Sequence, residues 1–291
     1  MTYHEEIIEL TDGRTLELAT AGSPSGATIF FHHGTPGTTR TMKSIEGLLD
    51  FGDFYLITTS RPGYGQSSRR ADRSIASVID DVSSVLAHVG RDDYVALGWS
   101  GGGPHALASA ALDEHCRAAV TLASVAPADV DFDWTEGMGP ENVQEFTMAT
   151  EGGPAYEEYM AATGEILGAA TTDNIIELIG GLLSQPDRDA LADDHARELF
   201  VEATRYAFVN GWRGYFDDNV AMMSPWGFDV GDIAIPVHLF YGDEDLMVPP
   251  PHGKWLSTHV PGATPCHLPE EGHISIFTNH LDDVAAALQA S

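Results

Sequence analysis

The chain has 291 residues with 14 basic and 44 acidic side chains, and its formal net charge at pH 7 is −30. With 43% hydrophobic residues, a chain of this length can form one large domain, or one domain with an insertion. The negative field argues against a protein that binds nucleic acid or anionic membranes through its overall charge. Recurring apolar runs argue against a disordered chain.

The cysteine content and the N-terminal residues bear on the compartment. Two cysteines, Cys116 and Cys266, are too few for a disulfide framework. Residues 1–10 lack the basic and apolar regions of a signal peptide, and no run of about 18 apolar residues occurs. We therefore expect a cytoplasmic protein without a membrane partner. The scarcity of lysine, with Lys43 and Lys254 the only two, and the acidic excess would also suit a high-salt proteome.

Buried strands and an amphipathic helix alternate along the first part of the chain. Residues 74–89 carry apolar side chains at helical spacing, with Ser74 as the expected capping residue. This alternation predicts a mostly parallel sheet covered by helices on both faces. Four short apolar runs predict the strands, at residues 27–32, 54–59, 94–98 and 118–124.

The pattern changes after Pro127 and resumes near Pro236. Residues 128–230 contain helical segments, such as 185–191, but no convincing buried strand. The later part predicts, in chain order, a strand at 236–241, a helix at 251–259, a strand at 264–268 and a helix at 281–289. We therefore expect an α/β core domain made of residues 1–127 and 231–291, interrupted by a helical cap, or lid, at residues 128–230.

The sharpest motif follows the third predicted strand. The sequence Gly-Trp-Ser-Gly-Gly at 98–102 joins that strand to a helix expected to begin near Pro104. A serine at the tip of so tight a turn needs a positive φ, and the residues two before and two after it must be very small for strand and helix to pass. Gly98 and Gly102 meet that requirement, so Ser100 is the expected nucleophile.

A glycine-rich loop offers a second part of such a site. The sequence His-His-Gly-Thr-Pro-Gly at 32–37 directly follows the first predicted strand, so the backbone N–H of Thr35 can face the serine. The N–H of Gly101, at a helix N-terminus, is the other expected donor of an oxyanion hole.

The base and its carboxylate are expected in the loops after the last two strands. His273 follows the final strand, at the carboxyl edge of the sheet, where it can reach the serine. The loop after the preceding strand holds three acids, among which we prefer Asp245, with Asp243 as the alternative. Asp129, after the fourth strand, is a third candidate. The chain order Ser, Asp, His is one of the known triad orders.

The sequence resembles the α/β-hydrolase-fold serine hydrolases through five motifs, which occur along the chain in the same order as in that family. The resemblance implies Ser100 as nucleophile, His273 as base, Asp245 as its orienting acid and a helical lid before Pro236. A serine at position 100 argues against the dehalogenase and epoxide hydrolase branches, which use an aspartate. No Walker loop or zinc spacing occurs, so we expect neither a cofactor nor a metal. The motifs are His33-Gly-Thr-Pro-Gly37, Arg61-Pro-Gly-Tyr-Gly-Gln-Ser67, Gly98-Trp-Ser-Gly-Gly102, Gly242-Asp-Glu-Asp-Leu-Met-Val-Pro249 and Gly272-His273.

These residues predict a hydrolase that cleaves a small neutral or apolar carboxylic ester through an acyl-enzyme intermediate. A proline-iminopeptidase-like aminopeptidase or amidase is the alternative, and it would need carboxylates in the cap to hold a free α-ammonium group. A non-catalytic ligand-binding member of the fold is a third, more distant reading. We expect a small-molecule substrate and no nucleic-acid partner, and the oligomeric state stays open.

The cap is predicted to hold pocket residues and most of the excess charge. Trp99, Met222, Trp226 and Phe228 are candidates for the substrate pocket, although we prefer a role for the last two in fastening the cap to the core. Residues 128–230 carry 21 acidic and 4 basic side chains, more than half of the net negative charge. Such a cap would repel polyanionic substrates and would attract cationic ones, which mildly favours the aminopeptidase alternative.

Overall fold

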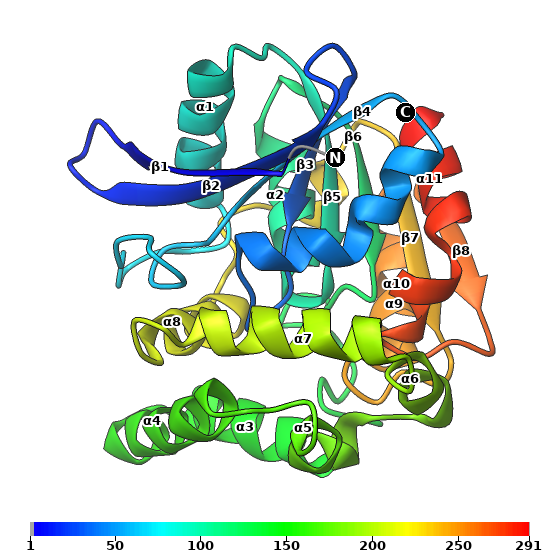
Figure 1. Cartoon of the computed structure of the whole chain (residues 1–291). Helices are drawn as coiled ribbons and strands as arrows, with labels where there is room; N and C mark the ends of the chain where they lie inside the picture. Colours follow the sequence, from blue (N-terminus) through cyan, green and yellow to red (C-terminus); the bar gives the residue numbers. More distant parts are fainter. Residues whose placement is uncertain (1–2, 291) are drawn as a thin grey trace.

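The computed structural model describes residues 3–290, with an eight-stranded sheet at its centre (Figure 1). The strand order across the sheet is β1-β2-β4-β3-β5-β6-β7-β8. The strands β3 to β8 run parallel to their neighbours, whereas β1 with β2, and β2 with β4, pair antiparallel. Their bounds are β1 His4–Glu9, β2 Thr15–Gly22, β3 Ala27–His32, β4 Phe54–Thr59, β5 Tyr94–Trp99, β6 Cys116–Leu122, β7 Val237–Gly242 and β8 Thr264–Leu268.

The six parallel strands coincide with the six apolar runs of the sequence, within two residues at each end. The hairpin β1–β2 was not predicted. Five of the six residues of β1 are exposed or half-buried, and four of them are charged or histidine, so this strand carries no buried apolar run. A turn with Gly13 at φ 83° connects the two strands.

Helices cover both faces of the sheet, as predicted (Figure 1). One face packs against α1 (Val78–Val89), α2 (Gly103–Leu112) and α9 (Pro250–His259), through a core that includes Val82, Leu107 and Leu256. The other face packs against the 3₁₀ segment η1 (Thr39–Asp50), α10 (Ser275–Asn279) and α11 (Leu281–Gln289), through a second core that includes Ile45, Ile276 and Leu288. None of the helices in the described part of the chain is long and apolar enough to cross a membrane.

The prediction of Ser74 as the N-terminal capping residue of helix α1 was wrong. The helix begins at Val78, and its N-cap residue is Ser77, without a capping bond from the side chain. Ser74 instead accepts a hydrogen bond from Ser77 Oγ at 2.7 Å through its carbonyl. The backbone N–H of Ala76 donates to the carbonyl of Trp226, so a contact with a distant segment holds residues 74–77 outside the helix.

A long helical stretch separates β6 from β7, and we refer to residues 123–236 as the β6–β7 segment. No strand occurs within it. The helices α3, α4 and α5 lie farthest from the sheet, with α7 and α8 between them and the rest of the molecule (Figure 1). The helix bounds are α3 Pro140–Glu151, α4 Pro154–Gly168, α5 Ile175–Leu178, α6 Gln185–Ala190, α7 Asp194–Ala207 and α8 Arg213–Met222, with short 3₁₀ turns at Gly180–Leu182 and Val230–Asp232. The division into a core and a cap at residues 128–230 stays a prediction, and residues 1, 2 and 291 of the expected core lie outside the described residues.

A buried carboxylate joins this segment to the sheet. Asp218 of α8 is fully buried and lies 2.7 Å from the guanidinium of Arg61, with Arg73 as a second ionic partner. The hydroxyl of Tyr64 also donates to it, at 2.9 Å. Burial alone would raise the pKa of Asp218, but the two guanidinium groups hold that pKa well below its ordinary value. The carboxylate is therefore charged and fully hydrogen-bonded.

We predict that Asp218→Ala lowers the free energy of unfolding by about 3–5 kcal/mol, because it leaves two buried guanidinium groups without their anion. Urea denaturation measures the effect. The matched control is Asp217→Ala, whose partner Arg69 is 34% exposed and can return to water, so the loss should be smaller. Equal stability of Asp218→Ala and the unmodified protein would contradict the prediction.

Candidate active site

Ser100 stands at the junction of β5 and α2 with a φ of 56°, in the left-handed region. A non-glycine residue in this region is strained, and the surrounding glycines permit it. A Cβ on Gly98 would lie 2.5 Å from the carbonyl oxygen of Gly102, and a Cβ on Gly102 would lie 2.0 Å from that of His32. Strand β5 and helix α2 can therefore pass each other only with glycine at both positions. This is the steric requirement from which the motif predicted the turn.

His273 and Asp245 are in direct contact. The Nδ1 atom of His273 lies 2.8 Å from Oδ2 of Asp245, and both side chains are buried. The other carboxylate oxygen accepts the backbone N–H groups of Met247 and Val248 at 2.8 and 2.7 Å, so Asp245 is held in one orientation.

The two other acids that were considered lie elsewhere. Asp243 is 37% exposed and pairs with His267 at 2.9 Å, and Asp129 is exposed on the surface. Of the three acids considered, the structure thus brings only the preferred one, Asp245, to the imidazole of His273.

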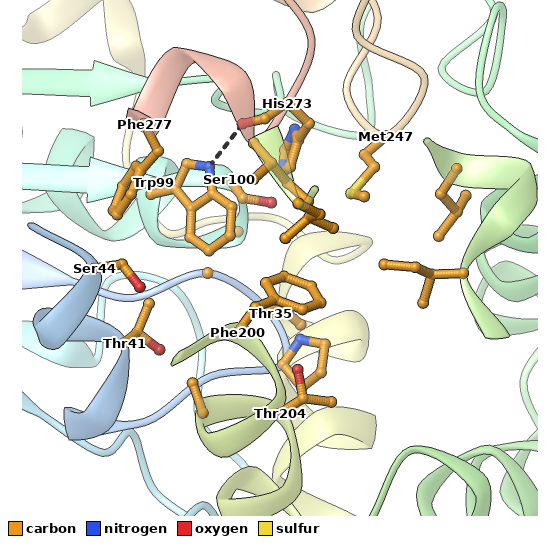
Figure 2. A pocket seen from close by; sticks show the side chains of 18 of the residues that line it. Thr35, Thr41, Ser44, Trp99, Ser100, Phe200, Thr204, Met247, His273 and Phe277 are labelled. Atoms are coloured by element: carbon orange, nitrogen blue, oxygen red, sulfur yellow. Dashed lines mark hydrogen bonds between the residues drawn. The ribbon is translucent and has the colours of Figure 1, made fainter. Parts of the chain in front are cut away.

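The environment of His273 favours its protonated form. Burial by itself opposes the charge, but the carboxylate of Asp245, and to a lesser extent that of Asp187, raise the pKa of His273 above its ordinary value. The indole of Trp99 lies against the imidazole, with ring centres 5.3 Å apart, and donates from Nε1 to the His273 carbonyl at 3.2 Å (Figure 2). The ring is therefore fixed from two sides.

The two predicted oxyanion residues are adjacent. A Cβ placed on Gly101 would come within 2.4 Å of Oγ1 of Thr35, so the loop after β3 touches the turn that carries Ser100. The Thr35 hydroxyl donates to Asp218 at 2.8 Å, and Arg61 donates to the carbonyl of Gly34 at 2.9 Å. The buried ion pair therefore holds the loop in place.

That anchoring was not predicted. The motif that begins at Arg61 entered the sequence analysis only as part of the family resemblance, and no sequence signal connected it to Asp218, which lies 157 residues later.

A cavity of about 480 Å³ opens beside Ser100 (Figure 2). Its wall includes Ser100, His273 and both predicted oxyanion residues, together with Trp99 and Met222 from the expected pocket. Most other lining side chains are apolar, among them Phe200 of α7, Met247, Phe277 and Ile274. Ser100, His273 and the two predicted oxyanion residues thus border one largely apolar cavity.

Two of the expected pocket residues do not line this cavity. Trp226 is 3% exposed and packs in the core, where its Nε1 donates to the Met222 carbonyl at 3.1 Å. Phe228 stacks beside it at 5.8 Å between ring centres. The inclusion of Trp226 and Phe228 among the pocket candidates was wrong, because these aromatics fasten the end of the β6–β7 segment to the core, which is the role preferred for them above.

A polar group in the cavity wall was missed by the sequence reasoning. Glu145 of α3 lines the cavity and is buried, and it accepts hydrogen bonds from Tyr215 at 2.6 Å and Asn219 at 2.7 Å. Burial without a cationic partner raises its pKa to about 7, although the two hydrogen bonds act in the opposite direction. Within residues 3–290 the Oδ1 atom of Asn219 has no partner. Nothing in the sequence around Glu145 distinguishes it from the other acids.

Comparisons with known proteins agree with this architecture. Residues 27–147 match the family model described as the alpha/beta hydrolase fold. The pimeloyl-[acyl-carrier protein] methyl ester esterase of Aromatoleum aromaticum is 24% identical over 238 residues, which cover 80% of this chain and 85% of that protein. The solved structure of a bromoperoxidase from Bacillus anthracis has a TM-score of 0.72 at 17% identity, over 99% of both chains. The esterase RhEst1 from Rhodococcus sp. ECU1013 has a TM-score of 0.70 at 19% identity, over 100% of this chain and 99% of that one.

The family match over residues 27–147, the strand order and the turn at Ser100 together show that this chain has the α/β-hydrolase fold. The fold expected from the five sequence motifs is therefore confirmed, and the family model together with the named relative supports a hydrolase. At these identities the solved structures show the fold alone. The choice between the esterase and iminopeptidase branches stays a prediction.

We predict that Glu145→Gln stabilises the protein at pH 8 by ~3 kcal/mol and has little effect at pH 4. The folded protein holds the Glu145 proton up to about pH 7, whereas the unfolded chain releases it near the ordinary value of 4.5. Between these values the folded state binds more protons, so stability falls as pH rises, and the glutamine variant avoids that loss. Denaturant titrations at both pH values measure the difference. The control is Glu151→Gln, an exposed residue of the same helix, and an equal, pH-independent effect of both variants would contradict the assignment.

Proposed function

We propose that the protein hydrolyses small neutral or apolar carboxylic esters, with Ser100 as nucleophile, His273 as general base and Asp245 as the acid that orients the base. The observation that carries the proposal is the 2.8 Å contact of Asp245 with His273, which lines the same cavity as Ser100. A nucleophile, a base and a group that orients the base are the minimum for acyl transfer through a covalent intermediate.

The proposed reaction begins when His273 takes the hydroxyl proton of Ser100 as its oxygen attacks the ester carbonyl. The negative charge that develops on the carbonyl oxygen is held by the backbone N–H groups of Thr35 and Gly101. Collapse of this intermediate breaks the bond to the alcohol, which leaves with the proton from His273. Water then attacks the acyl-enzyme by the same route and releases the acid. Asp245 fixes the tautomer of His273 and stabilises the imidazolium.

The preference for small apolar esters follows from the cavity. Its volume of about 480 Å³ and its aromatic and aliphatic wall suit a small apolar acyl or alcohol group. Lys43, the lysine in the wall, is already paired with Glu202 at 2.8 Å, so a polyanionic substrate would find no free lysine there. The named relative from Aromatoleum aromaticum, which is a methyl ester esterase, is consistent with an ester substrate.

We predict that Ser100→Ala lowers the turnover of p-nitrophenyl butyrate by on the order of 10⁶-fold and abolishes labelling by a fluorophosphonate probe, because both need the serine oxygen. Steady-state rates and mass spectrometry of the labelled peptide provide the measurements. The control variant Ser83→Ala replaces an exposed serine of α1 and should behave as the unmodified protein. Full activity of Ser100→Ala would rule out the mechanism, and an unlabelled, inactive wild type would favour a ligand-binding role instead.

A second function, a proline-iminopeptidase-like aminopeptidase, is favoured by one observation. Glu145 places a carboxylate without a cationic partner in the cavity wall, and Asn219 adds an acceptor oxygen beside it. An α-ammonium group would supply both the missing positive charge and the missing donor protons.

Under this second function, we predict that prolyl p-nitroanilide is a better substrate than p-nitrophenyl butyrate and that Glu145→Gln slows its hydrolysis by 10-fold or more, since a charged hydrogen bond contributes about 1.5–3 kcal/mol. Glu151→Gln serves as the control, and kcat/KM for both substrates is the measurement. Ester hydrolysis that exceeds anilide hydrolysis, and an unchanged rate in Glu145→Gln, would leave the esterase as the function.

A further inference from the structure

Another buried carboxylate of the β6–β7 segment, that of Asp187, touches the loop that carries His273. Asp187 belongs to α6 and is fully buried, and α6 lies against α10, the helix that follows His273 (Figure 1). Within the described residues, no arginine or lysine pairs with this carboxylate, so its partners are hydrogen-bond donors.

The hydrogen bonds come from the histidine loop itself. Oδ2 of Asp187 accepts the backbone N–H of His273 at 3.1 Å and the hydroxyl of Ser184 at 3.0 Å. Oδ1 accepts the N–H groups of Ile274 and Ser275 at 2.7 and 3.0 Å. One side chain therefore fixes three consecutive backbone groups, beginning at the residue proposed as the base.

Gly272, the residue before His273, leaves the space that this contact needs. A Cβ on Gly272 would lie 2.3 Å from the Ser184 hydroxyl and 2.5 Å from Oδ2 of Asp187. Because any larger residue would push α6 away, the glycine of the Gly272-His273 motif permits the close approach of Asp187.

We propose that Asp187 is a positioning residue for His273, and that its charge stabilises the imidazolium during the reaction, so that the β6–β7 segment completes the active site rather than only covering it. The inference rests on the function proposed above. Asp245 holds the ring through Nδ1 and Asp187 holds the backbone of the same residue, so the base is fixed from both ends.

The charged groups that face His273 support an electrostatic role. Asp245, from the loop after β7, and Asp187, from α6, both act to raise the pKa of His273. Glu271, two residues earlier, is engaged by His280 at 3.1 Å. Removing the charge of Asp187 would therefore make the imidazolium less stable, so His273 would stay neutral, and able to act as a base, at lower pH.

The test is the pH dependence of the rate at which a fluorophosphonate labels Ser100, since this rate needs the base but no identified substrate. In Asp187→Asn we expect the acid limb of the profile to move to lower pH and the plateau rate to fall by on the order of 10²-fold, because the base is less well placed. The control Asp189→Asn removes an exposed acid of the same helix and should leave both unchanged.

A fall in the plateau without movement of the limb would be a purely structural effect and would overturn the electrostatic role. An unchanged profile would overturn the proposal altogether. If Asp187→Asn does not fold, Asp187→Ser replaces it in the same assay, because a serine hydroxyl can still accept a backbone N–H at the start of a helix. A wild type that is not labelled at Ser100 would instead refute the proposed function, which separates the two failures.

Discussion

The ion pair between Asp218 and Arg61 connects three parts of the molecule that are far apart in the sequence. The carboxylate comes from α8, the guanidinium from the turn after β4, and the Thr35 loop is hydrogen-bonded to both. A charge pair removed from water is stable only when its remaining hydrogen-bonding atoms also find partners. The Gly34 carbonyl and the Thr35 hydroxyl are such partners, so the geometry that keeps the pair stable also fixes the loop proposed to bind the oxyanion.

The ion pair of Asp218 also shows that part of the large negative charge does not lie on the surface. Residues 128–230 carry 21 acidic side chains against 4 basic ones, and an acidic surface was the simplest interpretation. Several of these acids are buried and have structural partners instead: Glu145, Asp187, Asp217 and Asp218. Arginines of the first 80 residues neutralise two of them, Asp217 and Asp218. The surface field is therefore weaker than the count suggests, and part of the acidity of this segment serves to hold the site together.

Features that depend on local geometry could be predicted from the sequence. The place of Ser100 in a strained turn could be predicted because the turn requires glycine at fixed offsets, and the proximity of His273 to Asp245 because parallel strands end at one edge of the sheet. Asp187, Asp218 and Glu145 could not be predicted, since their roles arise from how helices without a strong apolar pattern pack on the core. The hairpin β1–β2 was missed because its first strand is exposed and charged. Trp226 and Phe228 were misplaced because large aromatics suit a pocket wall and a core equally well.

The central claim is that Ser100, His273, Thr35 and Gly101 form one acyl-transfer site. A crystal structure of the protein after reaction with a fluorophosphonate tests it directly, because the phosphonate mimics the tetrahedral intermediate. The account predicts a covalent bond from Ser100 to phosphorus, with the phosphoryl oxygen within hydrogen-bonding distance of the Thr35 and Gly101 backbone nitrogens. An adduct on another residue, or a phosphoryl oxygen that points away from both nitrogens, would contradict it.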